Sequence, residues 1–178
     1  LDGEIQRENA AVAKGILEAL IDLGWDINSQ HIKQGFASAQ WPGRLQEKFW
    51  EGQTILLDGA HNPHAIKQLS KERLNWSHSN ETVNWIIGIQ IQKDAPTMLR
   101  HLMKEVDVAW IVPVANHQSW TKEELCKACP EFSTQLHQAK DPIEVLKQLK
   151  SKGEWPTTAP VITGSLYLIG DLIPILTD

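Results

Sequence analysis

Two strand-to-helix turns carry the residue types that could do chemistry. The first is Leu57-Asp58-Gly59-Ala60-His61-Asn62-Pro63-His64, in which a carboxylate follows an apolar run and an imidazole comes three residues later. An Asn-Pro pair alone indicates only a well-formed helix start, with Asn as the N-cap and Pro as the first helical residue. Such a turn needs neither Asp58 nor His61, so these two side chains indicate a binding site.

The second turn is Val161-Ile162-Thr163-Gly164-Ser165-Leu166-Tyr167. A Gly-Ser step that opens a helix can offer a hydroxyl and backbone N–H groups to a carboxylate or a phosphate. Taken alone, the motif is weak, and Ser165 is better explained as a structural N-cap. Both turns have the form expected at the carboxyl ends of strands in an open parallel sheet, where ligands bind.

Short apolar runs alternate with helical patterns through most of the chain, which predicts an α/β fold of three layers. Continuously apolar strands indicate a mostly parallel sheet with helices on both faces. The expected strands are residues 54–57, 83–89, 108–112, 133–136 and 161–163. The expected helices are residues 63–74, 96–104, 122–128 and 142–150, and a last one from Leu166.

The first residues have a different pattern, with helices expected from Glu4 to Leu23 and over residues 29–37. Gln40-Trp41-Pro42-Gly43 then reads as a hinge or turn. A domain boundary near Ala39 would divide the chain into residues 1–38 and 39–178. Residue 1 is Leu and the helical pattern begins almost at once, so we expect a piece of a longer polypeptide.

Composition narrows the function classes. The 178 residues carry 17 Lys+Arg and 22 Asp+Glu, so the net charge is 17 − 22 = −5. Without a basic stripe, a sequence-independent nucleic-acid binder is not expected. The apolar tail from Leu166 to Leu176 contains Asp171 and Pro174 and is shorter than the ~20 apolar residues of a membrane span. With no signal peptide pattern, we expect a soluble cytoplasmic protein.

Other motifs are weaker. Cys126-x-x-Cys129 lacks a second ligand pair at zinc spacing, so these thiols are expected to be inert and no metal site is predicted. His117 follows an expected strand and could face the same cleft, although a surface-loop histidine is the simpler interpretation. The sequence contains neither Gly-x-x-x-x-Gly-Lys-Ser/Thr nor Gly-x-Gly-x-x-Gly. This chain alone is therefore not expected to grip a triphosphate in the usual way.

Four segments in order resemble the C-terminal third of the folylpolyglutamate synthase/dihydrofolate synthase family, a branch of the Mur ligases. They are Gln6-Arg7-Glu8-Asn9-Ala10, Trp41-Pro42-Gly43-Arg44-Leu45, the turn from Leu57 to His64, and Thr163-Gly164-Ser165-Leu166-Tyr167. The resemblance implies that residues 1–38 are the helical tail of a central ATPase domain. The remainder would be a Rossmann-like C-terminal domain.

The resemblance also implies a reaction. Members of this family use ATP to phosphorylate a pteroate or folate carboxylate, and the amine of L-glutamate then attacks the acyl phosphate. The implied cofactors are ATP and Mg²⁺, bound mainly by an upstream domain. The implied partners are L-glutamate and a folate or dihydropteroate substrate, in a monomer that binds neither nucleic acid nor membrane. This chain by itself would be inactive.

Site residues follow from the same resemblance, with no residue assigned a catalytic role. The ATP-binding residues would be Asn9, Arg44 and Asp58, the glutamate-binding residues His61, Ser165 and Tyr167, and the candidate cleft residues Lys93 and Asp94. An arginine fork suits phosphate oxygens, and a hydroxyl with an imidazole suits a carboxylate. Ile5 and Gln92 depart from the family, which commonly has His and Asp at these positions.

Two other functions stay open. A ligase that builds cell-wall precursors uses the same fold, but a different amino-acid-recognition string would be expected in place of residues 58–63. A binding module that recognises a nucleotide or an amino acid without chemistry is the alternative outside the enzymes. The sequence also leaves open whether the first glutamate is added to dihydropteroate, later ones to a folate, or both.

Overall fold

The chain forms two compact units, Leu1–Pro42 and Gly43–Asp178. The computed structural model describes residues 4–39, 43–75, 81–151, 153 and 155–177. The hinge expected at Gln40-Trp41-Pro42 lies outside the described residues.

The first unit consists of two helices, α1 (Glu4–Asp22) and α2 (Ser29–Ser38). Gly24 has a φ of 90° just beyond α1, a conformation that glycine adopts without strain, so the helix ends there. Asn28 caps α2, because its side chain accepts a hydrogen bond of 2.9 Å from the backbone N–H of His31. Both expected helices are therefore present, with ends within a residue or two of those expected.

The second unit contains a six-stranded sheet in the order β1-β2-β6-β3-β4-β5. Its strands are β1 (Gln46–Trp50), β2 (Gln53–Leu57), β3 (Asn84–Ile87), β4 (Val108–Ile111), β5 (Leu136–Gln138) and β6 (Val161–Thr163). All neighbours are parallel except β1 and β2. The mostly parallel sheet predicted from the sequence is confirmed.

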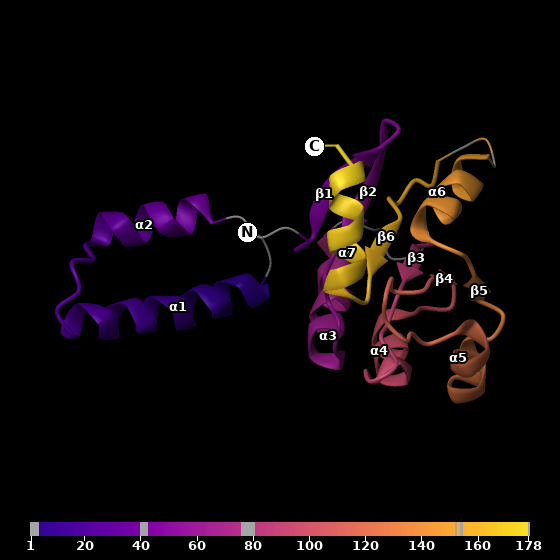
Figure 1. The fold of residues 1–178 in the computed structure, drawn as a ribbon, viewed down its shortest axis with the longest axis horizontal. Coiled ribbons are helices and arrows are strands. Elements are labelled where there is room, and N and C mark those ends of the chain that lie inside the picture. Colours follow the sequence, from indigo (N-terminus) through magenta and orange to yellow (C-terminus); the bar gives the residue numbers. More distant parts are fainter. Residues whose placement is uncertain (1–3, 40–42, 76–80, 152, 154, 178) are drawn as a thin grey trace. The chain divides into compact units, whose positions relative to one another are not determined.

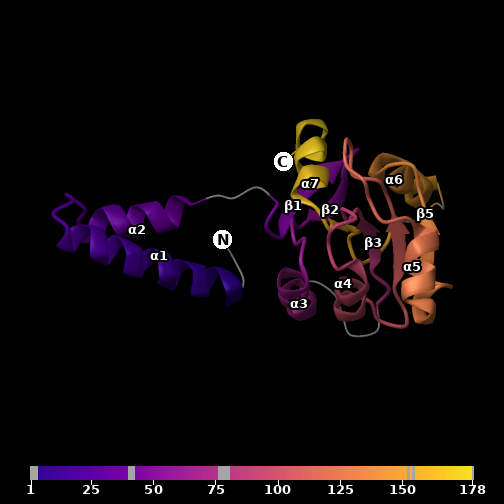
Figure 2. The same ribbon diagram turned by 60° about the horizontal axis from the view of Figure 1, so that its bottom comes forward.

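Helices cover both faces of this sheet, so the three-layer prediction is also confirmed. Successive strand residues point to opposite faces, and accordingly Ile87 packs in one buried cluster and Ile86 in the other. The first cluster includes side chains of α3 (Pro63–Glu72), α4 (Ala95–Leu102) and α5 (Lys122–Ala128). The second includes side chains of α6 (Pro142–Ser151) and α7 (Leu166–Leu172). Figure 1 labels these elements, and Figure 2 shows the strands between the two layers, with α6 and α7 above and α3 and α4 below.

Two features of the sheet differ from the sequence-based expectation. Strand β1 was not expected, because Gln46, Glu47 and Lys48 give its five residues no apolar run. It forms as an antiparallel edge strand through a tight turn at Glu51-Gly52, whose φ angles of 48° and 77° suit a two-residue hairpin loop. Strand β5 lies later than the expected residues 133–136, because a 3₁₀ turn occupies Pro130–Phe132 just before it.

A buried ion pair lies at the amino-terminal ends of the central strands. Arg73 donates from Nη1 and Nη2 to the two carboxylate oxygens of Asp107 at 2.6 and 2.7 Å, and both side chains are at most 1% exposed. Asp107 also accepts hydrogen bonds from the backbone N–H groups of Val83 and Lys104 and from the indole of Trp85. One carboxylate thus joins the end of α3 to the starts of β3 and β4.

We predict that Asp107→Ala lowers the free energy of unfolding by about 3–5 kcal/mol, because it leaves the Arg73 guanidinium buried without its counter-ion. Urea unfolding followed by tryptophan fluorescence measures this change. Glu131→Ala is the matched control, since it removes the carboxylate from the exposed Arg100–Glu131 pair and should barely alter stability. Equal losses in the two variants would contradict the role given to Asp107.

Candidate functional site

The sheet topology creates a crevice at the carboxyl end of β6. This strand lies between β2 and β3, with Leu57 opposite Ile162 and Ile87 opposite Thr163. The helix that follows β6 packs on one face, whereas the helices that follow β2 and β3 pack on the other. Ligands of open α/β sheets bind where neighbouring connections diverge in this way.

A cavity of about 570 Å³ lies at the carboxyl end of β6. It is lined by His61, Gln90, Lys93, Ser165, Leu166 and Tyr167. These residues follow three different strands, since His61 comes after β2, Gln90 and Lys93 after β3, and the other three after β6. The three residues expected to bind glutamate therefore lie together, with Lys93 beside them. Together they offer an ammonium, an imidazole and two hydroxyls to a ligand.

Asp58 joins the start of the second unit to the end of β2. Its Oδ2 accepts a hydrogen bond of 3.0 Å from the N–H of Leu45, and its Oδ1 accepts one of 2.9 Å from the N–H of Ala60. Only 7% of Asp58 is exposed, and this burial raises the pKa of its carboxyl, against the lowering effect of the two N–H groups and of Arg44. The carboxylate thus holds Arg44, the neighbour of Leu45, near the strand end.

His61 is oriented by its own turn. Its Nδ1 lies 2.9 Å from the carbonyl oxygen of Gly59, so Nδ1 carries the hydrogen and Nε2 is the nitrogen left to meet a ligand. The next residue, Asn62, caps α3 by accepting a hydrogen bond of 2.9 Å from the N–H of Ala65. The expected N-cap is confirmed, and it fixes the backbone beside the imidazole.

Two glycines permit the close approach of the strand ends. Gly164 has a φ of 103°, and a Cβ built there would lie 2.6 Å from the carbonyl oxygen of Gly88. A Cβ on Gly59 would lie 3.3 Å from the carbonyl oxygen of Gly43 and closer still to the side chain of Leu166. The turns after β2 and β6 can therefore pack this tightly only without side chains at these positions.

Ser165 and Tyr167 occupy the start of α7. Ser165 Oγ accepts a hydrogen bond of 3.2 Å from the N–H of Tyr167, so Ser165 is both an N-cap and a cavity residue. The Tyr167 side chain is largely exposed and its ring packs against that of His117 in a tilted arrangement, with ring centroids 4.3 Å apart. The sequence placed His117 only as a weaker candidate for the cleft, and no motif pointed to Gln90.

Two further candidates, Asp94 and Asn9, are not among the residues that line this cavity. Asp94 is exposed and caps α4 by accepting a hydrogen bond from the N–H of Thr97, so it does not line the cavity with Lys93. This arrangement favours the solvated-loop interpretation for Asp94. Asn9 lies on α1 in the first unit. Its contact with a nucleotide stays a prediction.

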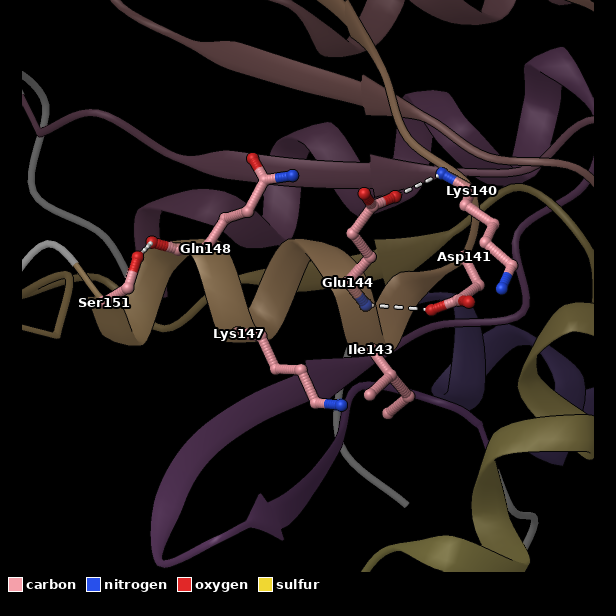
Figure 3. A pocket seen from close by; sticks show the side chains of 7 residues that line it. All are labelled: Lys140, Asp141, Ile143, Glu144, Lys147, Gln148 and Ser151. Carbon is pink, nitrogen blue, oxygen red and sulfur yellow. Dashed lines mark hydrogen bonds between the residues drawn. The ribbon is translucent and has the colours of Figure 1, made fainter.

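A second hollow, of about 620 Å³, runs along α6. Glu144 and Gln148 project to one side of the helix and Ile143 and Lys147 to the other (Figure 3). Glu144 Oε2 accepts a hydrogen bond from the N–H of Lys140, and Asp141 caps the helix through the N–H of Glu144. Its carboxylates thus serve the helix start rather than a shared ligand.

The described part of the chain contains no group of three His, Cys, Asp or Glu side chains that could hold a metal ion. Cys126 and Cys129 are free thiols, and burial raises the pKa of Cys129, which disfavours a reactive thiolate. Among the helices described, none is both long enough and apolar enough to cross a membrane.

Comparison with known proteins gives a consistent result. Residues 44–175 match the model of the family described as dihydrofolate synthetase, C-terminal domain. Folylpolyglutamate synthase of Lacticaseibacillus casei is 32% identical over 171 residues, which cover 94% of this chain and 37% of that protein. The crystal structure of folylpolyglutamate synthase from Thermotoga maritima is 27% identical, with a TM-score of 0.68, over 98% of this chain and 39% of that one.

A bifunctional folylpolyglutamate synthase/dihydrofolate synthase, solved with Mn, AMPPNP and L-glutamate bound, shares the fold at 24% identity. Its TM-score is 0.67, and the match covers 84% of this chain and 35% of that one. The chain thus spans about two fifths of the length of the relatives it matches. Since the matched family region takes in most of the chain and every cavity residue, the chain belongs to the dihydrofolate synthetase C-terminal domain family.

Proposed function

We propose that this chain is the C-terminal part of an ATP-dependent ligase that adds L-glutamate to a folate or dihydropteroate carboxylate. The observation that carries the proposal is the cavity at the end of β6, which brings His61, Lys93, Ser165 and Tyr167 together. Family membership supports the reaction class. In this account the chain supplies the amino-acid site and one wall of the nucleotide site.

The chemistry requires an activated carboxylate. A carboxylate is a poor electrophile because oxide is a poor leaving group. Phosphorylation of the carboxylate by ATP makes phosphate the leaving group instead. The amine of L-glutamate can then attack the acyl carbon and expel phosphate. Charge that develops on the transferred phosphoryl group must be met by cationic and hydrogen-bonding groups.

The cavity suits an amino acid that carries two carboxylates. The Lys93 ammonium and the hydroxyls of Ser165 and Tyr167 can donate hydrogen bonds to carboxylate oxygens, and His61 can do so when its Nε2 is protonated. Gln90, which is 9% exposed, adds an amide to the same wall. We propose that these groups bind the carboxylates of L-glutamate and leave its amine directed out toward the acyl phosphate.

The nucleotide side would be formed by Arg44, with Asp58 as its support. A guanidinium presents a planar fork of donors that fits phosphate oxygens, and the carboxylate of Asp58 holds the loop that carries it. Both oxygens of Asp58 already accept backbone hydrogen bonds, so we favour a positioning role for Asp58 over a direct nucleotide contact. Asn9, on α1, would meet the nucleotide from the first unit.

Mg²⁺ would accompany ATP in this proposal. The described residues hold no cluster that fits a divalent cation, so its ligands would come from another part of the ligase. The bifunctional enzyme solved with Mn, AMPPNP and L-glutamate bound holds the same kinds of partner.

Of the other functions considered, the family match favours a folate ligase over a cell-wall ligase. A binding module without chemistry would not need both an arginine for phosphate, Arg44, and an amino-acid cavity. We further propose that the ligase acts as a monomer in the cytoplasm, where free thiols such as Cys126 and Cys129 persist.

We predict that His61→Ala in the full ligase raises the KM for L-glutamate by about tenfold or more, because a hydrogen bond to a charged group contributes about 1.5–3 kcal/mol. Steady-state kinetics at saturating ATP measure the change. His64→Ala is the control, since His64 is the exposed second residue of α3 and does not line the cavity. A KM for L-glutamate that stays unchanged in His61→Ala would remove His61 from the site.

Asp58→Asn should loosen the Arg44 loop, because an amide has a single oxygen and leaves Leu45 or Ala60 without its acceptor. We expect a higher KM for ATP in this variant, as in Arg44→Ala, with the KM for L-glutamate little changed. An unchanged KM for ATP in both variants would contradict the nucleotide assignment.

The same variant makes a prediction about pH. Burial raises the pKa of Asp58 in the native state above the 3.8 of the unfolded chain. The native state therefore binds the proton more tightly, and the Asp58 contribution to stability falls as pH rises from 3.8 through the native pKa. Urea unfolding at a series of pH values should show wild type losing stability relative to Asp58→Asn across that window. A difference that is constant or of opposite slope would contradict the assignment.

A further inference from the structure

Tyr167 needs a partner to keep its place at the cavity. It is 58% exposed, and its backbone is fixed by the hydrogen bond to Ser165 Oγ, but its ring stands at the rim. An exposed aromatic side chain can populate more than one rotamer. The ring of His117 lies against it, with centroids 4.3 Å apart and planes 35° apart. This tilted ring pair is a direct contact between Tyr167 and the His117 loop.

His117 is held by its own turn. Its N–H donates to the carbonyl oxygen of Val114 at 3.1 Å, and its Nδ1 lies 2.8 Å from the carbonyl oxygen of Ala115. Asn116 between them has a φ of 60°, a left-handed conformation that asparagine tolerates better than most residues. The imidazole is thus directed by the backbone, although it is exposed.

The loop that carries His117 is also joined to the segment after β3. Ile91 N–H donates to the carbonyl oxygen of Gln118, and Trp120 N–H donates to that of Ile89, each at 2.9 Å. The indole of Trp120 donates to the carbonyl oxygen of Lys93 at 3.0 Å. These bonds tie the His117 loop to the segment that supplies Gln90 and Lys93. Tyr167 and that wall of the cavity are therefore linked through one loop.

We infer that His117 is a positioning residue that holds the Tyr167 ring over the cavity and so sets the affinity for the amino acid. The identity of that amino acid rests on the proposed function, whereas the ring contact does not. His117 contacts Tyr167 and is not among the residues that line the cavity. Its removal should therefore weaken amino-acid binding and leave the chemical step nearly intact.

The ring contact can be tested directly, because Tyr167 is the single tyrosine of the chain. The 178-residue chain labelled with 3-fluorotyrosine should give one ¹⁹F resonance, which Tyr167→Phe removes. We expect His117→Ala to move this resonance toward the position of the unfolded chain and His117→Phe to keep it near the wild-type position. A resonance that does not move in His117→Ala would overturn the inference.

Kinetics of the full ligase supply the second arm. His117→Ala should raise the KM for L-glutamate by about twofold to tenfold, as expected for loss of one ring pair, with kcat within about twofold of wild type. His117→Phe should restore most of the affinity, and His101→Ala, an exposed histidine on α4, should change neither constant.

The two arms separate the possible failures. If the wild-type ligase turns over with L-glutamate but His117→Ala leaves its KM unchanged, the positioning role is wrong and the proposed function stands. If KM rises while the fluorine resonance stays in place, His117 acts by another route and the inference is also wrong. If L-glutamate supports no turnover in wild type, the proposed function fails and takes the substrate part of the inference with it.

Discussion

The carboxylate of Asp58 is the junction on which the candidate site depends. It is a buried charge, and burial raises its pKa, so keeping it ionised has a cost that its two backbone N–H donors partly offset. In return it joins the loop after Gly43 to the end of β2. Gly59 strengthens the same junction, since its N–H donates to the carbonyl oxygen of Gly43 at 2.7 Å. Arg44 is thereby placed near the turn that carries His61.

The amino-terminal ends of the strands carry a stabilising ion pair, whereas the carboxyl ends carry the candidate site. At the amino-terminal ends, Arg73 and Asp107 form a buried ion pair with a nearly complete set of hydrogen bonds. At the carboxyl ends, the turns after β2, β3 and β6 approach one another closely at Gly59, Gly88 and Gly164. They leave a cavity lined by polar groups. Because the strands are anchored at their amino-terminal ends, their carboxyl ends can present side chains from three strands in fixed positions.

Much of this arrangement could be predicted from the sequence. The parallel strands and their helices follow from apolar runs and helical periodicity, and the turn after β2 is marked by its Asp58-to-Pro63 string. Strand β1 could not be predicted in this way, because an edge strand exposes one side and carries polar residues there. Its presence depends on the Glu51-Gly52 turn and on pairing with β2, neither of which a search for apolar runs detects.

The site shows the same division. His61, Ser165 and Tyr167 lie in recognisable turns, so the sequence could single them out, but Gln90 and His117 lie in loops without a motif. Their positions depend on hydrogen bonds between loops far apart in the sequence, such as that from Ile91 to Gln118. Lys93 and Asp94 are adjacent in the sequence but have different roles. Lys93 lines the cavity, whereas Asp94 caps a helix.

The central claim is that this chain provides the amino-acid site of a folate ligase, and ATP-dependent phosphate release tests it most directly. The full ligase would be given ATP and L-glutamate with either dihydropteroate or tetrahydrofolate, beside reactions that lack one component. We expect release that requires both L-glutamate and at least one of the two pterins, and the preferred pterin then identifies the reaction. Release that neither pterin supports, or that does not depend on L-glutamate, would contradict the account.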